Sequence, residues 1–107
     1  MKISQALREK TLLSFELFPP KTEKGMENLP DTIDHLMKYK PAYISCTYGA
    51  GGGNVGANRE VCQMIKKAGT TPVTHFTVIK NTKEGIKEQL DQYLAEGVDH
   101  MLALRGD

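Results

Sequence analysis

Four short apolar segments alternate with three amphipathic helical patterns, and this alternation restricts the possible folds more than any other feature of the chain. The apolar segments cover residues 12–18, 42–47, 73–79 and 100–104. Successive segments begin roughly thirty residues apart, which is the usual length of a strand–helix–strand unit. Strands that alternate with helices form parallel sheets with right-handed crossovers. The sequence therefore predicts an α/β fold with a parallel βαβαβαβ order.

The helical segments each carry one apolar stripe between recognisable start and stop signals. The expected helices run from near Asn28 to Lys40, from Asn58 to Gly69 and from Asn81 to Gly97. Pro41 ends the first helix, because a proline disfavours the α conformation of the residue before it. Asn58 is expected to cap the second helix, and Asn81 with Glu84 resembles a capping box for the third. Residues 1–11 are polar and predict a short helix or a mobile lead-in.

Two architectures share this order of elements, a doubly wound nucleotide-binding sheet and a (β/α)₈ barrel. The doubly wound sheet needs a glycine fingerprint directly after its first strand, but Pro19 and Pro20 stand there. The glycines of residues 49–53 fit neither GxGxxG nor GxxxxGK[ST]. A barrel collects side chains at the carboxyl ends of its strands, and polar residues stand at those ends here. We therefore expect a TIM-type barrel.

The length of the chain allows only part of such a barrel, because a complete one has eight strands and about 250 residues. We expect residues 1–107 to form one domain, the amino-terminal half of a (β/α)₈ barrel. The first and last strands would then be open edges. The chain is therefore expected to be a truncated portion of a longer enzyme, or to form a homo-oligomer or pair with a complementing chain.

Composition argues against several classes of function. The chain has 14 basic and 13 acidic residues, for a net charge of +1, and so has no electrostatic footprint for nucleic acid. It contains no apolar stretch of bilayer-spanning length and no signal core near its start, which predicts a cytoplasmic protein without membrane contact. Cys46 and Cys62 lack metal-ligand spacing, so we expect reduced, packed thiols and no metal site.

A single carboxylate, Glu16, interrupts the apolar segment SFELFPP. In an extended strand Ser14 and Glu16 share one face, while Phe15 and Leu17 share the other. An ionised carboxylate in a buried strand is costly without a partner, so burial would favour the protonated form. A carboxyl that stays protonated near neutral pH can act as a general acid. The alternative is a strand-end glutamate that faces water.

Polar residues at the ends of the other strands are further candidates, although each is a weak signal alone. Thr47 has an ordinary structural interpretation, and His75 could be a hydrogen-bonded core histidine. The glycine-rich residues 48–54 would let a planar cofactor approach the backbone closely, because no Cβ stands in the way. Arg105 could bind a phosphate or pyrophosphate, and Asp107 could accept hydrogen bonds from a heterocycle. In a parallel barrel all of them would meet at one rim.

Four segments in order, SFELFPPK, YISCTYGAGGG, THFTV and LALRGD, resemble the methylenetetrahydrofolate reductase family. The resemblance spans residues 14–107 and covers the first half, or less, of that family's catalytic barrel. The first and last segments are specific in combination, whereas the helices between them are generic. Leu17 stands where a Phe is more usual, and Cys46 where a small or aliphatic residue is common.

The resemblance implies a flavin-dependent oxidoreductase of one-carbon and methionine metabolism. Such an enzyme reduces 5,10-methylenetetrahydrofolate to 5-methyltetrahydrofolate, with NAD(P)H as hydride donor and FAD as cofactor. Glu16 would match the general acid that protonates the folate nitrogen, and Asp107 the aspartate near flavin and pterin. The positions that line FAD would be matched by Thr47, Tyr48, Ala50, His75, Arg105, Gly106 and Asp107. An inactive half-barrel binding or assembly module remains the alternative, and the choice between NADH and NADPH stays open.

Overall fold

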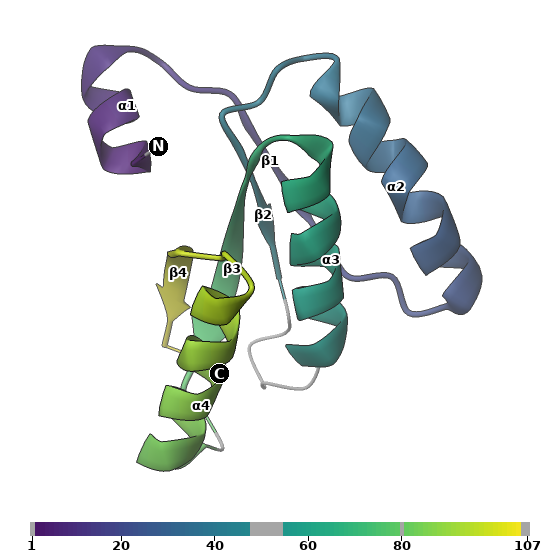
Figure 1. Cartoon of the computed structure of the whole chain (residues 1–107). Helices are drawn as coiled ribbons and strands as arrows, with labels where there is room; N and C mark the ends of the chain where they lie inside the picture. The colour runs from purple at the N-terminus through teal and green to yellow at the C-terminus, as the bar shows by residue number, and fades with distance from the viewer. Residues whose placement is uncertain (1, 48–54, 80, 106–107) are drawn as a thin grey trace.

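The computed structural model describes residues 2–47, 55–79 and 81–105, which form a parallel sheet with helices packed on one face (Figure 1). The strands are β1 (Ser14–Leu17), β2 (Tyr43–Cys46), β3 (Thr71–Thr77) and β4 (His100–Leu104). The helices are α1 (Ile3–Glu9), α2 (Glu23–Met37), α3 (Val55–Ala68) and α4 (Lys83–Ala95). The strand order is β1-β2-β3-β4, with every neighbouring pair parallel. This confirms the predicted βαβαβαβ order, the pattern of half a (β/α)₈ barrel.

The register of the sheet separates apolar from polar residues as the period of two predicts. Phe15 pairs with Ile44 and Leu17 with Cys46, and these four side chains belong to the core on the helix side. Glu16 pairs with Ser45, and this pair lies between the two apolar pairs. Because side chains alternate along a strand, Glu16 and Ser45 point away from the helices. The sheet therefore has one helix-covered face and one face that carries Glu16.

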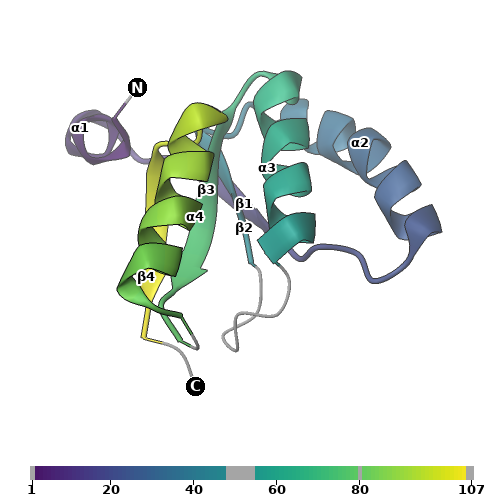
Figure 2. The same cartoon turned by 60° about the horizontal axis from the view of Figure 1, so that its bottom comes forward.

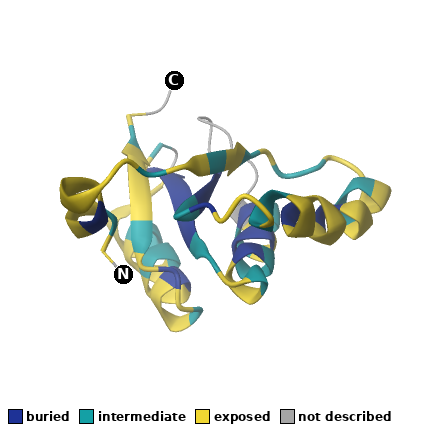
Figure 3. Ribbon diagram, turned by 90° about the horizontal axis from the view of Figure 1, so that it is seen from above, coloured by how far each residue is buried: buried dark blue, intermediate teal, exposed yellow. Residues whose placement is uncertain are grey.

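The core lies between the sheet and α3, with contributions from α2 and α4. Ile44 of β2 and Val61, Cys62 and Ile65 of α3 are each 0% exposed. Figure 3 shows the buried residues gathered at the centre of the molecule, with exposed residues toward both flanks. Burial of these apolar side chains, at about 25 cal/mol per Å², stabilises the half-barrel arrangement.

The strand expected at residues 12–18 forms over Ser14–Leu17, but it is not buried as expected. β1 is an edge strand with helices on one side only, and its residues alternate between exposed and half-buried. Phe18, the last residue of that expected strand, is 72% exposed. The other edge strand, β4, also leaves Met101 and Leu102 exposed, at 42% and 47%. Both edges of the described sheet therefore lack a neighbouring strand.

Helix α2 begins at Glu23, earlier than the expected start near Asn28. Thr22 is its N-cap, because the side-chain oxygen accepts a hydrogen bond of 3.0 Å from the Gly25 N–H. Pro30 lies inside this helix rather than in its first turn.

Helix α4 is also capped by a threonine rather than by the predicted asparagine. Thr82 accepts a hydrogen bond of 3.0 Å from the Gly85 N–H, whereas Asn81 lies one residue outside the helix cap. Gly69 and Gly97 follow α3 and α4, which confirms them as the predicted stops, and both have a positive φ, of +103° and +81°. Within the described residues, no helix combines the length and the hydropathy needed to cross a bilayer.

Candidate functional site

The carboxyl ends of the parallel strands lie at one edge of the sheet, which we call the rim (Figure 2). Glu16 is the third residue of β1, Thr47 directly follows β2, and Arg105 directly follows β4. His75 lies within β3, beside Leu102 of β4 in the register. The parallel sheet thus places these predicted residues of four separate strands at or near one rim.

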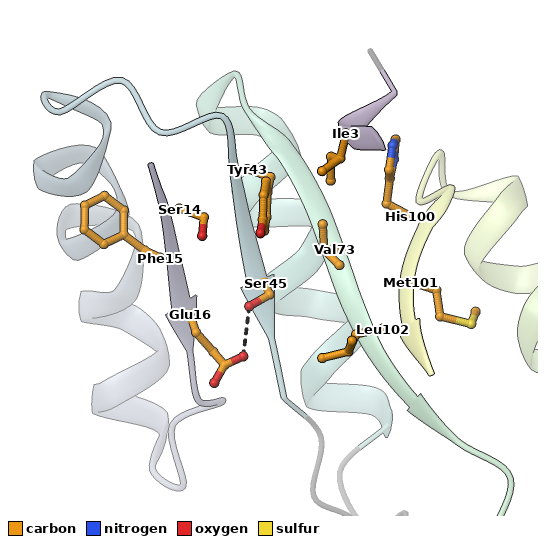
Figure 4. A pocket seen from close by; sticks show the side chains of 10 residues that line it. All are labelled: Ile3, Ser14, Phe15, Glu16, Tyr43, Ser45, Val73, His100, Met101 and Leu102. Atoms are coloured by element: carbon orange, nitrogen blue, oxygen red, sulfur yellow. Dashed lines mark hydrogen bonds between the residues drawn. The ribbon is translucent and has the colours of Figure 1, made fainter. Parts of the chain in front are cut away.

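Glu16 holds the centre of a three-strand hydrogen-bond cluster. Its Oε1 accepts a hydrogen bond of 3.0 Å from Ser45 Oγ of β2, drawn as a dashed line in Figure 4. His75 Nε2 of β3 lies 2.8 Å from the same oxygen. When Glu16 is ionised its oxygens only accept hydrogen bonds, so in that state Nε2 of His75 is the donor. The sheet therefore brings together residues that are 29 and 59 positions apart in the sequence.

Exposure differs sharply within this cluster. Ser45 and His75 are buried, at 8% and 7% exposure, whereas the Glu16 side chain is 48% exposed. The carboxyl group thus projects from a buried polar floor toward the open side of the sheet. The sequence led us to expect that apolar side chains bury this carboxyl group. The structure instead surrounds it with two hydrogen-bonding side chains and open space. Its other oxygen, Oε2, makes no hydrogen bond with the part of the chain that the structure describes.

A hollow of about 530 Å³ lies on the open face of the sheet beside Glu16. Figure 4 shows Glu16 and Ser45 at the rim end of this hollow, with Tyr43 and Val73 farther from the rim. Ile3 of α1 and His100 lie at the opposite end from Glu16. In a closed barrel this face would be the interior, which has its reactive groups at the carboxyl ends of the strands.

The remaining predicted residues divide into two groups. Thr47 is half-buried, and its N–H donates a hydrogen bond of 3.0 Å to the carbonyl oxygen of Leu17, which joins the ends of β1 and β2. Arg105 is exposed at the end of β4. The other predicted positions, Tyr48, Ala50, Gly106 and Asp107, lie outside the described residues, so their roles stay predictions.

Two residues of the site region were not recognised from the sequence. Ser45 was given no role, although it lies opposite Glu16 in the register of β1 and β2. Asn58 was interpreted as a helix cap, yet it lies inside α3 and is 0% exposed. The spacing of the sequence could have indicated this burial. Residue 58 lies on the same helical face as the apolar residues 61, 62 and 65.

Both cysteines are free and buried, as predicted. Burial raises the pKa of Cys46 to about 12 and that of Cys62 to about 11. Desolvation is the main cause for both thiols, and their mutual proximity adds to the shift at Cys46. Both side chains therefore stay protonated at neutral pH and act as small apolar groups of the core.

Comparison with known proteins gives a consistent family. The sequence model of the family described as methylenetetrahydrofolate reductase matches residues 2–107. A 5,10-methylenetetrahydrofolate reductase of Pectobacterium carotovorum subsp. carotovorum is 38% identical over 96 residues, which are 89% of this chain and 32% of that protein. The corresponding Escherichia coli (strain K12) protein is 35% identical over 96 residues, with the same coverage of 89% and 32%.

A plant relative gives the same result over a smaller share of its own length. The Arabidopsis thaliana protein named methylenetetrahydrofolate reductase (NADH) 1 is 37% identical over 98 residues, which are 91% of this chain and 17% of that protein. The chain therefore spans about a third of the bacterial relatives and less than a fifth of the plant relative.

Proposed function

Because this chain belongs to the methylenetetrahydrofolate reductase family, we propose that it contributes the amino-terminal half of the barrel of a folate-reducing flavoenzyme. The reaction is the reduction of 5,10-methylenetetrahydrofolate to 5-methyltetrahydrofolate with NAD(P)H, in one-carbon and methionine metabolism. The observation that carries the proposal is the Glu16 carboxyl group at the rim. One of its oxygens, Oε1, is held by Ser45 of β2 and His75 of β3, and Oε2 makes no hydrogen bond with the described part of the chain.

The two oxygens of Glu16 have different tasks in this proposal. Ser45 and His75 both donate to Oε1, which leaves that oxygen poorly placed to carry a further proton. The acidic proton therefore resides on Oε2, where it can be transferred to a nitrogen of the folate. Protonation of that nitrogen opens the methylene bridge of the substrate. Ser45 and His75 then stabilise the carboxylate that remains, since both hydrogen bonds strengthen when Glu16 is ionised.

The described rim residues fit FAD by the chemistry of their side chains. Thr47 offers a hydroxyl, and the exposed Arg105 offers a guanidinium group suited to a phosphate. His75 has its Nε2 engaged with Glu16, so only its Nδ1 is left for a flavin. When bound, FAD would supply the chemistry that passes a hydride from NAD(P)H to the folate. Tyr48, Ala50, Gly106 and Asp107 complete the proposed contacts, by their match to the family motifs.

The open edges β1 and β4 imply that the rim works with further strands. We propose that a complementing chain or a second copy of this chain covers them, and sedimentation velocity of the purified chain would distinguish the two. The name of the Arabidopsis relative specifies NADH, so NADH is the first hydride donor to test against NADPH. A cytoplasmic location stays part of the proposal.

The experiment separates the two half-reactions. The purified chain is mixed with FAD, reduced anaerobically with NADH or NADPH, and then reoxidised with methylenetetrahydrofolate, while the flavin absorbance is followed. Glu16→Gln should leave the reduction by the nicotinamide intact and block the reoxidation by folate, because an amide cannot donate the required proton. The matched control is Glu88→Gln on α4, an exposed glutamate away from the rim.

Two results would contradict the proposal. An equal loss of both half-reactions in Glu16→Gln would remove the role of Glu16 as the acid. A chain that retains no flavin after gel filtration from a mixture with FAD would contradict its turnover and favour the alternative, an inactive binding or assembly module.

A further inference from the structure

Asn58 of α3 is the centre of a buried polar network behind the rim. Its Nδ2 donates to the carbonyl oxygens of Cys46 at 3.0 Å and Thr47 at 3.3 Å, which are the last residue of β2 and the residue that follows it. Its Oδ1 accepts from Thr74 Oγ1 of β3 at 2.9 Å and from Tyr93 Oη of α4 at 2.6 Å. One side chain therefore connects two strands and two helices.

These contacts use the full hydrogen-bonding capacity of the amide. Both Nδ2 protons face carbonyl oxygens. Oδ1 faces the Tyr93 hydroxyl and the Thr74 hydroxyl, and the single proton of Thr74 is shared between Oδ1 and the carbonyl oxygen of His75. The flipped amide would turn its oxygen toward two carbonyl oxygens, so only one orientation satisfies the site. Because Asn58 is 0% exposed, no water can replace these contacts without opening the core. Asn58 is therefore held rigidly, and it holds its neighbours in turn.

The position of the network relates it to the rim. Cys46 pairs with Thr74, and this is the last pair in the register between β2 and β3. Asn58 contacts both members of that pair, the carbonyl group of one and the hydroxyl group of the other. The next residue along the chain is a rim residue in both cases, Thr47 directly after β2 and His75 within β3. Thr74 Oγ1 also lies 2.8 Å from the carbonyl oxygen of His75.

We propose that Asn58 is a positioning residue of the rim, which sets the separation between the end of β2 and the middle of β3 and so places His75 against Glu16. The sheet register ends at Cys46 and Thr74, so backbone pairing alone no longer spaces the strands beyond that point. The amide of Asn58 spans this end from the helix side. The inference rests on the proposed function only where it treats the rim as a catalytic site. The contact between His75 and Glu16, which it explains, is a feature of the structure itself.

The test uses the chain alone and reads the His75 ring by nitrogen-15 NMR. The ring resonances are identified by their loss in His75→Gln, and Glu16→Ala gives the shift of a ring without its carboxylate partner. Asn58→Leu keeps the side-chain volume close and removes every hydrogen bond of the amide. We expect it to move the His75 Nε2 resonance in the direction seen in Glu16→Ala.

A control distinguishes positioning from general loss of stability. Ile65→Val lies on the same buried face of α3 and weakens the core without touching the network, so His75 should keep its wild-type resonances. If Asn58→Leu does not fold, Thr74→Val is measured in its place, and we expect the same displacement of the His75 Nε2 resonance. This substitution is nearly isosteric and, of the contacts of Asn58, removes only the hydrogen bond to β3.

Unmoved His75 resonances in the folded variant, or an equal displacement in Ile65→Val, would overturn the proposal. The measurement needs neither FAD nor folate. Its failure would therefore leave the proposed function standing, and failure of the half-reaction experiment would leave this inference standing.

Discussion

Two glycines occupy the same position in two similar helix starts, and the structure predicts opposite results for them. The sequences Thr22-Glu23-Lys24-Gly25 and Thr82-Lys83-Glu84-Gly85 begin α2 and α4, each with a threonine cap that accepts from the glycine N–H. Helix propensity alone favours alanine over glycine by up to about 1 kcal/mol at both sites. The surroundings of the two positions decide whether this gain is realised.

At Gly25 an added Cβ would lie 2.7 Å from Cβ of Pro20 and 3.1 Å from Oγ1 of Thr22. Pro20 follows another proline, so its ring cannot move without a shift of the segment that ends β1. Overpacking of this kind costs about 1–3 kcal/mol, which exceeds the propensity gain. We expect Gly25→Ala to lower the free energy of unfolding by about 1–2 kcal/mol.

At Gly85 the nearest atom to an added Cβ would be Oδ1 of Asn81, at 3.0 Å. Asn81 is exposed, and its side chain can rotate away at the cost of a 3.3 Å hydrogen bond from Gln89. We expect Gly85→Ala to leave the free energy of unfolding unchanged or to raise it by up to about 1 kcal/mol.

The assay is urea unfolding at 25 °C followed by far-ultraviolet circular dichroism. Pro20→Gly removes the contacting Cβ, so the double variant Pro20→Gly/Gly25→Ala should recover much of the loss caused by Gly25→Ala in a double-mutant cycle. The reasoning is refuted if Gly25→Ala is as stable as the wild type, or if the cycle shows no coupling between positions 20 and 25.

Two further predictions concern the backbone and the buried thiols. Lys40 has a φ of +52°, and a left-handed conformation is unfavourable for any residue with a Cβ, so Lys40→Gly should raise the unfolding free energy by about 0.5–1 kcal/mol in urea titrations. Lys38→Gly, at a φ of −61°, should lower it instead, and the same sign for both variants would exclude backbone strain as the cause. Folding raises the pKa of Cys46 to about 12 and that of Cys62 to about 11 from 9.0, so the folded chain keeps protons that the unfolded chain releases. The thiols should therefore stabilise the fold fully below pH 9 and lose that contribution as the pH rises toward these folded-state pKa values. Cys46→Ala should show a shallower loss of stability with rising pH than the wild type, and identical slopes would contradict this linkage.

Local spacing was sufficient for much of the fold. The apolar segments and the stripes between them predicted the order of strands and helices, since a period of two or of about 3.6 residues is visible within one element. The same rule placed Glu16 with Ser14 on one face of their strand and Phe15 with Leu17 on the other. The helix caps were less accurate, because two neighbouring polar residues such as Asn81 and Thr82 can each serve as a cap and only backbone geometry selects between them.

The role of Asn58 shows the limit of such reasoning. A polar residue near a helix start is usually a cap, and this interpretation treated its neighbours in the sequence as its partners. The actual partners come from β2, β3 and α4, up to 35 positions away. A buried amide is only tolerated where such distant groups converge on it, and no local pattern contains that information.

The sequence by itself determined the succession of strands and helices and the face on which each side chain lies, because both depend on the spacing of residues within a single element. Only the tertiary structure decided that Glu16 is half-exposed and shares one carboxylate oxygen with Ser45 and His75. Those features arise where separate strands are brought side by side. Their physical origin is the parallel register of the sheet, together with the packing of α2, α3 and α4 on the face opposite Glu16.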